Sequence, residues 1–302
     1  MPDNDKNINL NFWLLAPEKE SPDAVEYTKQ REEIKNVFNS PPASFQPLEL
    51  FDSTVNVYEK IEQRGLYFLG TLIRNQIYDV PPKYDEQKLE LSRLPVEVGQ
   101  GLGYQTSFLF DPRYQIVMIE STNNCVGIST FCALLKKNFN LSVDPRLVID
   151  PAKMSAFNKM GVITKFKVKI ASLQHGDLLR THKRSAVGQI IHSADDTNTD
   201  TLEYTLSVGK RKSALNRERI RGLVRVFSKY DEEEIKTLIV TGKETDESDS
   251  NTIDFIQQKL RERITVDRPR INTTFNVDLH YTKLIEAYDR HPDLSVYKVK
   301  NS

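Results

Sequence analysis

The chain has 302 residues, and its 42 Lys and Arg residues balance its 42 Asp and Glu residues, so the formal net charge is zero. This length suits one large domain or two ordinary ones, and 14 Phe and 12 Tyr residues exclude a wholly disordered chain. A neutral chain has no overall attraction for nucleic acid, so any such affinity must come from local clusters of basic residues.

Only two cysteines occur, Cys125 and Cys132, and the N-terminal residues MPDNDKNINL form no apolar leader. Two cysteines in a chain of this length do not make a disulfide framework. No stretch approaches the length of a membrane span. We therefore predict a reducing, cytoplasmic location, no structural disulfide and no membrane insertion.

The first part of the chain predicts mainly strands. Period-two alternation or β-rich composition marks four segments, residues 8–14, 66–74, 104–110 and 114–120. The last two flank the turn sequence Asp111-Pro112-Arg113, which predicts an antiparallel hairpin. The charged segment 21–40 is compatible with a helix or with a loose excursion.

The middle of the chain predicts a helix over residues 129–139, a short strand over 146–149 and a helix from Pro151 to Met160. Residues 162–170 then alternate apolar side chains with Lys165, Lys167 and Lys169, which is the pattern of a half-buried strand. We expect this strand to share one sheet with the 104–120 hairpin. Lysines on such a strand commonly just keep an exposed face soluble.

The last part predicts a strand at 202–208, a basic helix from about residue 213 to 229 and a strand at 235–241. An acidic loop, 244–249, then leads to a predicted helix with Ile253, Ile256 and Leu260 on one side, and a final helix is expected at 279–290. These elements predict an α+β fold with a mixed, mainly antiparallel sheet and packed helices. We divide the chain into a β-rich region 1–170, a linker 171–200 and an α/β region 201–302.

The segment 209–229 is the strongest functional signal in the sequence. It contains eight basic residues and a single acid, Glu218, and its apolar residues Ile220, Leu223, Val224 and Phe227 recur with helical spacing. Arg217, Arg221, Arg225 and Lys229 follow one another every four residues, which places them in one cationic stripe. The stripe, supported by Lys210, Arg211 and Lys212, could contact a phosphate backbone and displace its counterions. The alternative is a solvated charged helix face.

The residues offer no catalytic site, metal site or cofactor site with a defensible spacing. Cys125 precedes a predicted helix but has no histidine near it in sequence, and His175, His182 and His192 have spacings that match no metal site. Asp144, Asp150 and Lys153 resemble a nuclease core only superficially. Gly99, Gly101 and Gly103 lead into a strand rather than a helix, so flexibility at a strand entrance is favoured over a phosphate-binding loop.

Two segments, LGTLIRNQIYDVPPK (69–83) and GLGYQTSFLFDPRYQIVMIESTNNCVGISTFCALLKK (101–137), resemble a family of uncharacterised bacterial and prophage proteins. The shared features are a strand ending in Arg74 before Pro81, the Phe110-Asp111-Pro112 turn, and a helix after Gly127 and Ser129. In general layout that family is similar to exclusion protein A of phage lambda and to abortive-infection components. By analogy, this resemblance implies phage defence, DNA binding and a second defence protein as partner.

We therefore expect a cytoplasmic phage-defence or abortive-infection protein that binds nucleic acid with little sequence discrimination and forms a homo-oligomer, a dimer above all. A non-enzymatic role is favoured over an enzyme. DNA is the favoured ligand over RNA. Two alternatives stay open at this stage. One is a metal-dependent nuclease effector, and the other is a protein-interaction module whose stripe meets an acidic partner.

Overall fold

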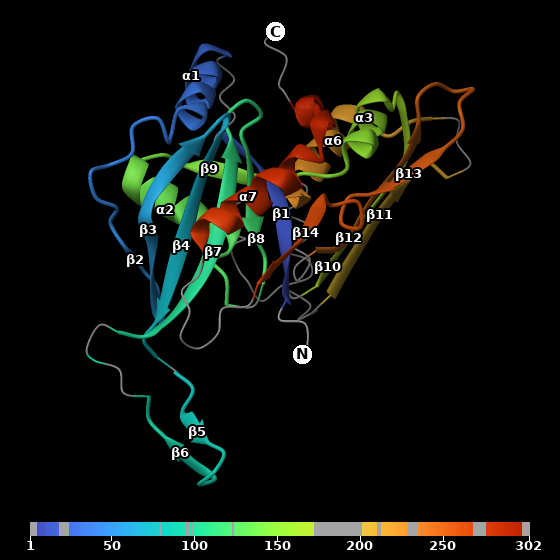
Figure 1. Ribbon diagram of the computed structural model, residues 1–302. Coiled ribbons are helices and arrows are strands. Elements are labelled where there is room, and N and C mark those ends of the chain that lie inside the picture. Colours follow the sequence, from blue (N-terminus) through green and yellow to red (C-terminus); the bar gives the residue numbers. More distant parts are fainter. Residues whose placement is uncertain are drawn as a thin grey trace. The chain divides into compact units, whose positions relative to one another are not determined.

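The computed structural model describes residues 5–17, 24–78, 80–94, 97, 100–122, 124–171, 201–209, 213–228, 235–267 and 276–297. The chain divides into two compact units. The first comprises residues 1–145 and 261–302, and the second comprises residues 146–260. Antiparallel sheets and several helices confirm the predicted α+β class (Figure 1).

The first unit is built on an eight-stranded sheet. Its strands in spatial order are β14 (Arg261–Asp267), β1 (Asp5–Pro17), β8 (Ile116–Glu120), β7 (Leu102–Asp111), β4 (Tyr67–Gln76), β3 (Ser53–Arg64) and β2 (Leu48–Glu49), and β9 (Val143–Leu147) also pairs with β1. The predicted hairpin is confirmed as β7 and β8, which pair antiparallel from Phe108↔Ile119 to Asp111↔Ile116.

Both faces of this sheet are covered, so its central strands do not alternate between buried and exposed residues. All five residues of β8 are buried, as are the last six of β7. Phe108 packs on one face against Phe131, with ring centroids 4.9 Å apart. The Phe108 ring also lies so close to Gly70 that a Cβ there would be 2.6 Å from it, so only glycine fits at this point of β4.

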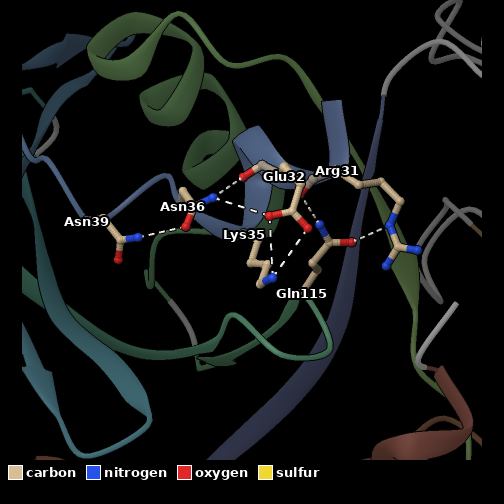
Figure 2. A network of polar contacts seen from close by, with 6 residues as sticks. All are labelled: Arg31, Glu32, Lys35, Asn36, Asn39 and Gln115. Atoms are coloured by element: carbon tan, nitrogen blue, oxygen red, sulfur yellow. Dashed lines mark hydrogen bonds and ion pairs between the residues drawn. The ribbon is translucent and has the colours of Figure 1, made fainter. Parts of the chain in front are cut away.

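The described residues of the first unit form the helical elements α1 (Ala24–Lys35), α2 (Ile128–Phe139), α7 (Val277–Asp289) and the 3-10 helix η1 (Pro292–Tyr297). The charged segment 21–40 is thus helical over its middle. Figure 2 shows how α1 is attached to the β7–β8 hairpin: the Gln115 amide accepts from Arg31 Nε at 2.9 Å and donates to the Arg31 carbonyl. Within the same view Asn36 Nδ2 donates to the Glu32 carbonyl at 2.8 Å and extends the network along the helix.

A separate two-stranded ribbon lies between β4 and β7 in sequence. It consists of β5 (Lys83–Asp85) and β6 (Glu90–Ser92), which pair antiparallel (Figure 1).

The second unit is built on a four-stranded antiparallel sheet. In spatial order its strands are β11 (Thr201–Ser207), β10 (Val162–Ala171), β12 (Ile235–Lys243) and β13 (Asn251–Asp254). The described residues of this unit also form helices α3 (Pro151–Lys159) and α6 (Arg217–Phe227). Phe166, Val168 and Ile170 of β10 are fully buried on one face. Phe166 meets Phe227 of α6 there, with ring centroids 6.4 Å apart.

The division of the chain differs from the predicted one in two ways. Residues 146–170 belong to the second unit, where β10 lies between β11 and β12, two strands that follow residue 200. Residues 261–302 return to the first unit, where β14 pairs with β1 from Asp5↔Asp267 to Asn11↔Arg261. Most of the predicted linker, residues 172–200, lies outside the described residues. Strand partners so far apart in sequence leave no local signal.

Two further expectations are wrong. The 104–120 hairpin and the strand at 162–170 belong to different sheets, because each alternating segment finds its partners within its own unit. The predicted helix around Ile253 is strand β13, whose Ile253 pairs with Val240, followed by a turn. Ile253, Ile256 and Leu260 are all buried, but Ile256 lies in the turn after β13 and Leu260 follows the bridge residue Lys259. Their spacing therefore imitates one face of a helix.

Candidate functional site

The basic segment forms helix α6, and it is shorter than predicted. Leu215 N donates to Ile163 O at 2.7 Å, which holds the chain as a bridge beside β10. Asn216 then caps the helix, since its side chain accepts from Arg219 N at 3.0 Å. Ile220, Val224 and Phe227 are buried, so the predicted apolar face of the helix is confirmed.

Two arginines of the stripe converge on one backbone carbonyl. Arg217 Nη2 and Arg221 Nη2 donate to Asn158 O, at 2.8 Å and 3.0 Å. Asn158 lies in the last turn of α3, where carbonyl oxygens lack partners within the helix and carry the negative end of its dipole. The stripe therefore links α6 to the end of α3, a structural role that the sequence did not indicate.

The convergence brings like charges together in a partly buried place. Burial, followed by the charges of Arg217 and Arg225, lowers the pKa of Arg221, while Glu218 opposes this effect. Arg221 Nη1 lies 3.7 Å from Glu218 Oε1, and the Glu218 side chain is 82% exposed. The Arg221 guanidinium also lies 6.0 Å from the centroid of the Phe157 ring. The Nε atoms of Arg217 and Arg221 are buried without a hydrogen-bond partner among the described residues.

The rest of the predicted stripe is only partly placed. Arg225 is exposed on the next turn of α6. Lys210, Arg211, Lys212 and Lys229 lie outside the described residues.

The face of the second sheet opposite α6 carries the three predicted lysines of β10. Lys165 is exposed and lies opposite Ser207 and Thr241, while Lys169 lies opposite Glu203 and Thr237. Lys167 Nζ is 3.0 Å from Glu203 Oε1. This face is therefore polar and partly neutralised by a carboxylate.

The carboxylates considered for a nuclease are used locally. Asp150 caps α3, its Oδ1 accepting from Lys153 N at 3.1 Å. Asp144 belongs to the first unit. Burial of the Cys132 thiol and, as a smaller cause, the nearby charge of Asp144 raise the pKa of Cys132 to about 12. Among the described residues no group of three or more His, Cys, Asp or Glu side chains could hold a metal ion. His175, His182 and His192 lie outside these residues.

The cysteines and the glycine run have structural roles. Cys125 and Cys132 are free, and Cys125 Sγ lies 2.7 Å from Thr122 Oγ1. Gly101 stands directly before β7, where a Cβ would lie 2.1 Å from the Gln76 carbonyl oxygen, so the backbones approach too closely for any other residue. Gly99 lies outside the described residues.

A second polar site, which sequence reasoning missed, lies under helix α7 in the first unit. We call it the α7 seam and define it by Thr71, Ser107, Asp111, Glu120, His280, Tyr281 and Tyr288. Thr71 Oγ1 lies 3.1 Å from Ser107 Oγ and 3.2 Å from the Tyr281 hydroxyl. Glu120 Oε1 and His280 Nε2 lie 3.0 Å apart, and both side chains are almost completely buried.

Asp111, the turn aspartate of the hairpin, is the best-satisfied residue of the α7 seam. It is completely buried and accepts from Arg113 N at 2.9 Å, from the Arg113 guanidinium at 2.7 Å and 3.0 Å, and from the Tyr288 hydroxyl at 3.0 Å. Burial is the main cause that raises the pKa of Tyr288. These four hydrogen bonds use both carboxylate oxygens of Asp111 and hold α7 on the hairpin turn.

A small apolar pocket between α2 and the first sheet offers no chemistry either. It is lined by aromatic and aliphatic side chains with one amide, Asn138. Asn138 already bonds to both Gln46 N and Gln46 O. A pocket without converging polar groups does not suggest catalysis.

The sequence from residue 51 to residue 299 matches the model of a family described as a family of unknown function (DUF6731). The chain belongs to this family. The matched segment contains α6 and all seven residues of the α7 seam, but not β1. No curated protein matches the sequence. The family description names no activity, so the resemblance to phage-exclusion proteins stays a prediction.

No helix among the described residues is long and apolar enough to cross a membrane.

Proposed function

We propose that the second unit binds the phosphate backbone of nucleic acid through α6, with little sequence discrimination. The observation that carries this proposal is the convergence of Arg217 and Arg221 on Asn158 O, with Arg225 on the next turn. Each bound guanidinium has several N–H donors, and one carbonyl occupies only one of them.

The physical argument is electrostatic. Arg217 and Arg225 both act on Arg221 as like charges, and Glu218, which lies 3.7 Å from Arg221 and opposes them, is mostly exposed and therefore well screened. A phosphate group placed beside them would relieve this repulsion and supply acceptors for the remaining donors. The anchored guanidinium groups lose less side-chain entropy on binding than freely moving ones would.

The charge balance of the unit supports the same proposal. Residues 146–260 contain 20 Lys and Arg residues and 16 Asp and Glu residues, so this unit is positive within a neutral chain. The basic residues 210–212 and Lys229 flank α6 in sequence and would add to the local field.

The test must separate binding from the structural role of the arginines. We would change Arg217 and Arg221 together to Gln, which removes both charges and, because Gln is shorter, also the hydrogen bonds to Asn158 O. The matched control changes both to Lys, which keeps both charges. A second control changes Lys165 and Lys169 to Gln on the opposite face of the same sheet.

Binding of labelled DNA and RNA oligonucleotides is measured by fluorescence anisotropy at several salt concentrations, with thermal melting of every variant. We expect the Gln pair to weaken binding at least about tenfold, or about 1.4 kcal/mol, and to reduce the salt slope by about two. The Lys pair should keep the slope. The proposal fails if the wild type does not bind at low salt, or if the Gln pair binds as tightly as the wild type. A loss only in the Lys165 and Lys169 variant would place the contact on the sheet face instead.

The predicted role in phage defence belongs to this proposal and rests on the resemblance alone. If it is right, cells producing the wild type should reduce the plaque count of a sensitive phage, and the Gln pair should not. An acidic protein partner, the alternative, would bind α6 with the same salt dependence while oligonucleotides do not compete.

A further inference from the structure

The β5–β6 ribbon is an amphipathic element with an uncovered apolar face. Tyr84 pairs with Leu91, so both side chains point to one side of the ribbon. Lys83, Asp85, Glu90 and Ser92 point to the other side. Tyr84 is 52% exposed and Leu91 is 69% exposed.

Two strands alone are marginally stable in water, and at least a third strand or a packed face is normally needed. Among the described residues β5 and β6 pair only with each other. The outer edge of β5 is thus a row of backbone groups available to another strand.

The sequence of β5 identifies the strand that fits this edge. Lys83 and Asp85 stand on either side of Tyr84 with opposite charges. A strand with this pattern is complementary to itself when two copies run antiparallel. We propose that β5 pairs with β5 of a second copy of this chain about a two-fold axis at Tyr84.

This pairing places Lys83 of each copy opposite Asp85 of the other, and Tyr84 opposite Tyr84. Opposite charges and aromatic pairs at directly opposed positions stabilise antiparallel strands. The result is a four-stranded sheet with Leu91, Tyr84 and their counterparts in one continuous apolar row.

The charges within the ribbon also favour this partner. Asp85 lies opposite Glu90, so two like charges face each other in the isolated ribbon. Lys83 of a second copy would offset that repulsion. The edge of β6 lacks the same symmetry, because its sequence is Glu90-Leu91-Ser92. Pro81 and Pro82 lack N–H donors and limit the new pairing to the short strand itself.

The first test is a cross-linking experiment on the full chain with Cys125 and Cys132 changed to Ala. Tyr84→Cys puts two thiols at directly opposed positions, whose Cβ atoms would lie about 5 Å apart. Leu89→Cys is the matched control, since Leu89 is more exposed at 74% but its two copies would lie on the order of 20 Å apart. With a short bismaleimide, Tyr84→Cys should form covalent dimers and Leu89→Cys should not.

The second test uses charge, without a cross-linker. Lys83→Glu should raise the dimer dissociation constant at least about tenfold in sedimentation equilibrium, because attraction becomes repulsion at two symmetric positions. Asp85→Asn should weaken the dimer less and keep the turn, since Asp85 Oδ1 accepts from Gln87 N and Lys88 N. Circular dichroism checks that both variants fold.

The proposal is overturned if the wild type stays monomeric over the whole concentration range. It is equally overturned if Leu89→Cys cross-links as well as Tyr84→Cys, or if folded Lys83→Glu dimerises like the wild type. None of these outcomes bears on oligonucleotide binding by α6, so the two proposals fail separately.

Discussion

Helices α7 and α6 both pack on antiparallel sheets, but they place their polar side chains in opposite ways. Helix α7 buries His280, Tyr281 and Tyr288 against polar partners in its sheet. Helix α6 buries only apolar residues and keeps its arginines at the margin, where two of them reach the end of α3.

The difference shows that the buried polar groups of the α7 seam and the arginines at the edge of α6 can serve different purposes. A buried polar group must be matched by a specific partner, so the α7 seam allows one position of the helix on the sheet and penalises others. This matters because α7 follows the whole second unit in the chain and must return to a sheet whose other strands, apart from β14, end by residue 147. At the margin of α6, by contrast, Arg217 and Arg221 each keep an Nε donor that has no partner among the described residues, and the binding proposal rests on such donors.

The largest expected effect comes from the apolar support of α6. Phe166→Asp would bury an unpaired carboxylate against Phe227, at a cost of several kcal/mol, on the order of a domain's whole stability. We expect the second unit to lose its cooperative melting transition, while Phe166→Leu keeps it. Normal melting of Phe166→Asp would contradict the assignment of this face.

The next largest effect should come from the α7 seam. Asp111→Ala leaves the Arg113 guanidinium and the Tyr288 hydroxyl without their shared acceptor and should cost about 3–5 kcal/mol. Asp111→Asn keeps part of the hydrogen bonding and should cost less. Urea denaturation measures both. Equal stability of the alanine variant and the wild type would mean that α7 is positioned by its apolar contacts alone.

A pH dependence sharpens the comparison further. Burial is the main cause that raises the pKa of Tyr281 to about 12, from 10 in an unfolded chain. A raised pKa means that the folded state holds the proton more tightly, so this stabilisation is complete below pH 10 and is lost as the pH rises toward 12. Tyr281→Phe should cost about 1 kcal/mol at pH 7. The stability of this variant should decline less between pH 10 and 12, and an unchanged decline would exclude Tyr281 as a contributor.

The smallest effect is expected at the margin of α6. Arg217→Gln removes one charge and one exposed hydrogen bond to Asn158 O from a half-exposed position, so it should cost no more than about 1 kcal/mol. Calorimetry should show a small shift in Tm. A cost as large as that of Asp111→Ala would mean that the arginines are primarily structural, which would weaken the binding proposal.

Local patterns in the sequence determined much of this molecule. The alternation in β10, the turn sequence between β7 and β8, and the apolar spacing of α6 each identified the correct element, because side-chain direction follows directly from backbone geometry. The α+β class followed from these elements. The helix at 253–260 failed because buried residues of a short strand and a turn can imitate helical spacing.

Only the tertiary structure decided the partners. Nothing local to β14 indicates that it pairs with β1, and nothing local to Glu120 indicates that it meets His280. The Asn158 carbonyl that holds two arginines is a backbone atom, and every residue has one. Such contacts join groups far apart in sequence, and their energy depends on burial and distance, which a single sequence does not contain.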